Sequence, residues 1–125
     1  NRLAAANLAP QRKLTFGYDP TKSGGIFQIK RMGYEDAEFI FFGWNQEIRR
    51  NTAQQIEVRK GSNRDIRIAV VRKMIAIIRE HVQGDFNWES QRLDRTLSLS
   101  ARPGDNAGLE EFLMHEFFDD PRLPR

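Results

Sequence analysis

The chain has 125 residues, of which 39% are hydrophobic and 30% are charged. This length suits one hydrophobic core, and the composition is typical of globular proteins and unlike that of disordered chains. The longest apolar run without a charge, Met74 to Ile78, is far too short to cross a bilayer. Cysteine is absent, which excludes a disulfide, a thiolate nucleophile and a cysteine metal site.

We predict three parts along the chain. Residues 1–12, rich in Ala and Asn, form a linker-like or frayed start, and residues 13–118 form a single α+β domain. Residues 119–125 contain two prolines and form an extended tail.

Alternation of apolar and polar residues predicts six strands. The period of two is clearest where Leu14, Phe16 and Tyr18 alternate with Thr15 and Gly17, as expected of a half-buried strand. Clusters of Gly, Asn, Asp and Pro separate the strands. The predicted strands are Lys13 to Tyr18, Ile26 to Met32, Glu38 to Trp44, Gln54 to Lys60, Phe86 to Glu89 and Thr96 to Ala101.

Apolar spacing predicts two helices. In Arg64 to His81 the apolar residues form two adjacent ridges, composed of Ile66, Val70, Met74 and Ile78 and of Val71, Ile75 and Val82. Ser62 with Asp65 three residues later matches a capping box in form, and Gly84 is expected to end the helix in a left-handed turn. Leu109, Phe112, Leu113 and Phe117 recur at helical spacing in the second, shorter helix.

The order of these elements indicates an α+β fold. Four strands, a long helix, two strands and a final helix follow one another, mostly through connections too short for parallel crossovers. We therefore expect an antiparallel sheet packed against one long and one shorter helix.

Few residues suggest a metal or phosphate site. His115 and Glu111 are four residues apart on the second helix, with Glu110 and Glu116 nearby, but this supplies too few ligands for zinc, and a solvated helix face is the better interpretation. Gly24-Gly25 precedes a strand, whereas a phosphate-binding loop precedes a helix, so we interpret it as a turn. We predict no metal site and no cofactor.

Acidic residues give an equally weak indication of catalysis. Asp85, Glu89 and Asp94 could place two carboxylates in one cleft, as a small hydrolase requires. All three flank turns, where acidic residues are ordinary. We therefore predict no catalytic residue, and a hydrolase is the third hypothesis.

A basic cluster is the most suggestive feature. Its predicted binding residues are Trp44, Arg49, Arg50, Arg59, Lys60, Arg64 and Arg67, and Arg72 and Lys73 follow them. With the tryptophan as a stacking platform they could bind phosphates of a nucleic acid. Glu47, Glu57 and Asp65 lie among them and the net charge is only +3, so a salt-bridged solvent face is the better interpretation.

Our leading hypothesis is a non-enzymatic protein-interaction domain, with a nucleic-acid-binding module as the alternative. An exposed edge strand, Lys13 to Tyr18 or Thr96 to Ala101, could accept an extended peptide. A more specific hypothesis places the chain in the bacterial periplasm, as the soluble C-terminal part of a tethered envelope protein, with the cytoplasm as the alternative. In role, though in no shared motif, this would be similar to TonB/TolA-type domains.

Overall fold

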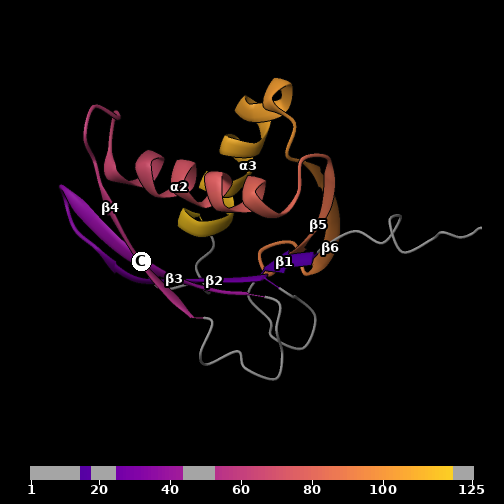
Figure 1. Ribbon diagram of the computed structural model, residues 1–125, viewed down its shortest axis with the longest axis horizontal. Coiled ribbons are helices and arrows are strands. Elements are labelled where there is room, and N and C mark those ends of the chain that lie inside the picture. Colours follow the sequence, from indigo (N-terminus) through magenta and orange to yellow (C-terminus); the bar gives the residue numbers. More distant parts are fainter. Residues whose placement is uncertain (1–14, 18–24, 44–52, 120–125) are drawn as a thin grey trace, which may run out of the picture.

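The structure, a computed structural model, describes residues 15–17, 25–43 and 53–119. In this part a mixed six-stranded sheet carries two helices against one face (Figure 1). The elements are β1 (Thr15–Gly17), β2 (Gly25–Met32), β3 (Asp36–Phe42), β4 (Gln54–Arg59), α2 (Ile66–His81), β5 (Asp85–Ser90), β6 (Arg95–Ser100), the 3-10 turn η2 (Pro103–Asp105) and α3 (Asn106–Phe118). None of the described helices is both long and apolar enough to cross a membrane.

The strand order confirms the α+β class and corrects the predicted pairing. The order is β4-β3-β2-β1-β5-β6, and β1 runs parallel to both β2 and β5, whereas the other neighbours are antiparallel. The expectation of an antiparallel sheet is therefore wrong at β1. Phe16 in this strand has no exposed surface, so the buried backbone around it needs hydrogen-bond partners on both sides.

The edges of the sheet differ in part from those expected. The predicted edge strand Lys13 to Tyr18 is wrong, because Thr15–Gly17 lies between two other strands. The predicted edge at Thr96 to Ala101 is confirmed, since β6 ends the strand order, and β4 forms the opposite edge. Glu57 and Arg59 on β4 place charge along that edge, a common protection against pairing with other chains.

The core lies between the sheet and α2. The predicted ridges of this helix are buried from Ile66 to Ile78, and Val82 packs partly buried against the same cluster. Opposite them the sheet contributes aromatic rings, with the centroids of Phe27 and Phe41 4.9 Å apart and Phe16 edge-on to Phe86 at 5.5 Å. Each of these buried side chains contributes about 1.5 to 3 kcal/mol relative to full exposure, so this interface dominates stability.

Both ends of α2 differ in detail from the expected ones. The helix begins at Ile66, and Asp65 is itself the N-cap, accepting hydrogen bonds from the backbone N–H groups of Arg67 and Ile68 at 2.9 and 3.2 Å. At the other end Val82 is an extended C-cap, so the predicted left-handed turn at Gly84 is wrong. The carbonyl of Gly84 instead accepts the N–H of Ala101, which extends the β5–β6 ladder.

The last two strands and α3 complete the sheet and its helical layer. β5 and β6 pair as an antiparallel hairpin, with Phe86 opposite Leu99 and Trp88 opposite Leu97. α3 follows and packs Leu113 and Phe117 into the core. Another side of α3 lies beside the start of α2, and this arrangement creates a concave surface between the two helices.

Candidate functional site

The structure brings together only part of the predicted basic cluster. Trp44, Arg49 and Arg50 lie outside the described residues. Arg59 lies opposite Asp36 at the end of β4, and the backbone N–H of Lys60 donates to the carbonyl of Glu35 at 2.8 Å. Arg64 and Arg67 flank the start of α2 and share a concave surface with α3.

Acidic partners neutralise several cations near the start of α2. Arg67 forms an ion pair with Asp65 at 3.2 Å, and Arg72 Nε forms one with Glu110 Oε2 at 2.9 Å. The hydrogen bond from the Arg67 guanidinium is the largest cause holding the pKa of Asp65 below its ordinary value. The cluster is thus a surface of mixed charge in this part, as the interleaved acidic residues suggest.

A cavity of about 430 Å³ lies between the start of α2 and α3. We call it the α2–α3 groove. Its apolar residues are Ile68, Ala107, Met114 and Phe118; its charged or titratable residues are Arg64 and Arg67 beside α2 and Glu110, Glu111, His115 and Asp119 on or directly after α3. The α3 residues recur every three or four positions from Ala107 to Phe118, so the groove follows this helix for about 17 Å.

The groove has walls of opposite charge. The α2 side contributes two arginines, whereas the α3 side contributes carboxylates. Glu110 is already engaged, because it accepts from Arg72 and from the side-chain amide of Asn106, and His115 contacts Asp119 through Nδ1. Within the described part of the chain, the side chains of Arg64 and Glu111 form no ion pair or hydrogen bond.

His115 and Glu111, weighed above as a metal pair, both line this groove. His115 and Asp119 are 51% and 55% exposed, so water surrounds both side chains. In residues 15–17, 25–43 and 53–119 no group of three or more potential metal ligands occurs.

The acidic residues considered for a hydrolase lie elsewhere, on the β5–β6 hairpin. Asp85 forms an ion pair with Arg102, and that hydrogen-bonded pair raises the pKa of the arginine above its ordinary value. Glu89 accepts a hydrogen bond from Thr96 Oγ1, and Asp94 occupies the turn with φ of 57°. None of these carboxylates lines the α2–α3 groove.

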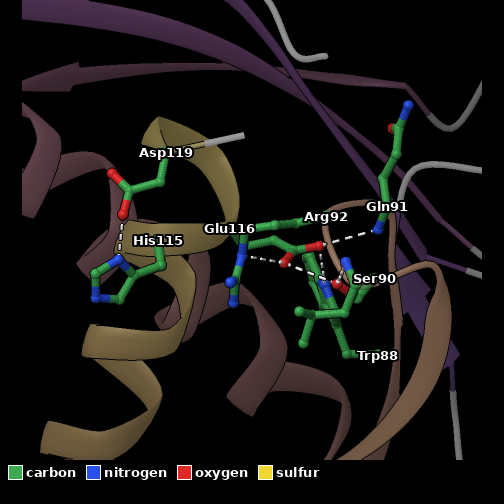
Figure 2. A network of polar contacts seen from close by, with 8 residues as sticks. Trp88, Ser90, Gln91, Arg92, His115, Glu116 and Asp119 are labelled. Carbon is green, nitrogen blue, oxygen red and sulfur yellow. Dashed lines mark hydrogen bonds and ion pairs between the residues drawn. The ribbon is translucent and has the colours of Figure 1, made fainter. Parts of the chain in front are cut away.

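The burial of Glu116 shows that the expectation of a solvated acidic face on the second helix is wrong at this position. Its side chain is fully buried, and Figure 2 shows it reaching from α3 to the end of β5 and the following turn. Oε2 accepts from Trp88 Nε1 at 3.0 Å and from the backbone N–H of Gln91 at 3.1 Å. Oε1 accepts from Ser90 Oγ at 2.9 Å and lies 3.4 Å from Arg92 Nε.

This network fastens α3 to the hairpin and thereby fixes the groove wall. Ser90 Oγ also accepts the backbone N–H of Leu93 at 3.0 Å, so the turn after β5 is held through the same carboxylate. The guanidinium of Arg92 lies 5.7 Å from the ring centre of Phe112, a second link to α3. Sequence reasoning missed Glu116, although its position three, four and seven residues after Leu113, Phe112 and Leu109 places it on the apolar face of the helix.

Comparison with known protein families, with curated proteins and with solved structures finds no match. The fold and the site therefore define the chain as an α+β domain with a charged groove between two helices. Its function has to be argued from the chemistry of that groove.

Proposed function

We propose that this chain is a non-enzymatic protein-interaction domain that receives a segment of its partner in the α2–α3 groove. The groove carries the proposal, because it combines an apolar floor with a charged, solvated rim, which is the usual anatomy of a protein interface. Its volume of about 430 Å³ would accommodate a few side chains of a partner.

The rim chemistry favours binding over catalysis. The groove is lined by no Ser, Thr or Cys among the described residues, so a nucleophile activated by His115 is not available there. His115 and Asp119 are both more than half exposed, whereas acid–base catalysis is favoured by a site that excludes water.

Nucleic-acid binding remains the alternative, and the charge pattern supports it less. A phosphate-binding surface needs cations that are free of carboxylates, whereas Arg67 and Arg72 are each paired with an acid. The groove also places Glu111 and Asp119 where a nucleic-acid backbone would be repelled.

Site-specific photocrosslinking in the source cells tests the proposal. A photoreactive amino acid replaces Ala107, which is exposed at the groove, and in a matched variant replaces Gln28, which is exposed on the sheet face away from the helices. We expect a discrete protein adduct from position 107 and none from position 28. Arg64→Glu in the groove should reduce that adduct, and Arg95→Glu on β6 should leave it unchanged.

Other outcomes decide against the proposal. A nuclease-sensitive adduct at position 107, together with oligonucleotide affinity that falls steeply with salt, would establish the nucleic-acid alternative. Equal adducts from positions 107 and 28, or none from either, would remove the groove as a protein-binding site. Location in the bacterial envelope stays a prediction, which fractionation of the same cells would test.

A further inference from the structure

The α2–α3 groove contains one cation and one carboxylate that no other described residue of the chain neutralises. Arg64 lies directly before the N-cap of α2, and Glu111 lies in the second turn of α3. Both line the groove and both are exposed, yet within the described residues neither side chain has an ion-pair partner. Because these two opposite charges line the same groove and do not pair with each other, a bound segment could pair with both of them.

The other charges of the groove do not compete for this role. Glu110 is held by Arg72 at 2.9 Å, Arg67 by Asp65 at 3.2 Å, and His115 contacts Asp119. At the start of α2, the backbone N–H groups of Arg67 and Ile68 already donate to the side chain of Asp65, which occupies the anion-binding position of the helix end. The unused charges are thus the pair on opposite walls.

We infer that the partner segment is dipolar, with an acidic residue that meets Arg64, a basic residue that meets Glu111 and apolar side chains between them. This inference rests on the proposed function and specifies its partner. The apolar centre would cover Ile68, Met114 and Phe118 on the floor.

Three blocked synthetic peptides test the inference directly. They are acetylated and amidated ELVLK, ELVLE and KLVLK, which share one apolar centre and differ only in their charged ends. Binding to the 125-residue chain is followed by the amide NMR shifts of Ala107 and Met114 in the groove. We expect ELVLK to bind about fivefold more tightly than either like-charged peptide, the gain of one exposed ion pair.

Single substitutions show which wall of the groove causes each peptide preference. Arg64→Gln should abolish the preference for ELVLK over KLVLK, and Glu111→Gln should abolish the preference for ELVLK over ELVLE. Arg95→Gln, an exposed arginine outside the groove, should preserve both preferences. All three positions are exposed, so far-UV circular dichroism should show the same folded protein in each case.

The failures of the inference and of the proposed function are distinguishable. Equal affinities for the three peptides, tightest binding of a like-charged peptide, or no shift at the groove would overturn the dipolar partner. A protein adduct at position 107 alongside any of these results would leave the interaction domain in place. A nucleic-acid adduct at position 107 would instead overturn the proposed function itself.

Discussion

Replacing Glu116 with glutamine keeps the shape of a buried side chain and removes its charge. The carboxylate accepts hydrogen bonds from Trp88, Ser90 and Gln91 and lies 3.4 Å from Arg92 Nε. Hydrogen bonds to a charged group contribute about 1.5 to 3 kcal/mol each, against about 1 kcal/mol for neutral ones. Loss of charge assistance in three bonds, less the smaller desolvation cost of glutamine, gives a destabilisation of about 2 kcal/mol.

The geometry adds a mismatch in the same direction. If the amide oxygen takes the place of Oε2, which serves two N–H donors, the amide nitrogen must face Ser90 Oγ and the N–H of Arg92. Two donors then oppose each other at a buried position. The result should be a lower free energy of unfolding with little change in the surface exposed on unfolding.

Urea unfolding followed by far-UV circular dichroism measures this effect. Glu116→Gln should lower the midpoint by about 1 M urea at an unchanged slope, given slopes of about 1 to 3 kcal/mol/M. Glu111→Gln is the matched control on the exposed side of the same helix and should change stability by less than about 0.5 kcal/mol. If both variants unfold at the same midpoint, the network does not stabilise the fold.

Three further predictions concern caps and backbone. Asp65→Ala should cost about 1 kcal/mol, because it removes the N-cap of α2, and urea midpoints would measure the loss. Folding lowers the pKa of Asp65, so the stability that its carboxylate contributes is complete above the unfolded pKa and is lost as the pH falls through the folded pKa. The difference in urea midpoint between wild type and Asp65→Ala should therefore shrink from neutral pH to about pH 3. Gly61→Ala should destabilise the protein by about 1 kcal/mol, because φ at this position is +56°. Gly108→Ala in α3 should stabilise it by about 0.5 kcal/mol, because an added Cβ meets nothing within 4 Å. A melting temperature that is higher for Gly61→Ala than for Gly108→Ala would contradict this reasoning.

Local patterns in the sequence determined the helices and the strands. The apolar ridges of α2 and the alternation in β5 and β6 report which face of each element is apolar. That face is buried in α2 and β5 and partly buried in β6. Such periodicity depends on residues a few positions apart, so it is visible without knowledge of the rest of the chain.

The site was only partly accessible to the same reasoning. Arg64 and Arg67 were predicted as binding residues from their charge, and the structure places both in the groove. Glu111 and His115 were considered as a pair without a connection to them. No local signal links positions 64 and 111, because the contact between α2 and α3 depends on how both helices pack on the sheet.

Tertiary structure alone decided the position of β1 and the role of Glu116. A strand pattern states which residues face the core but not which strands become neighbours, so Thr15–Gly17 could be placed between β2 and β5 only by the fold. A glutamate on a helix is usually solvated, and it becomes a buried anchor only when donors from another element reach it. Trp88 and Ser90 lie more than twenty residues away in the sequence and supply those donors, because packing of α3 on the hairpin brings them into contact with the carboxylate.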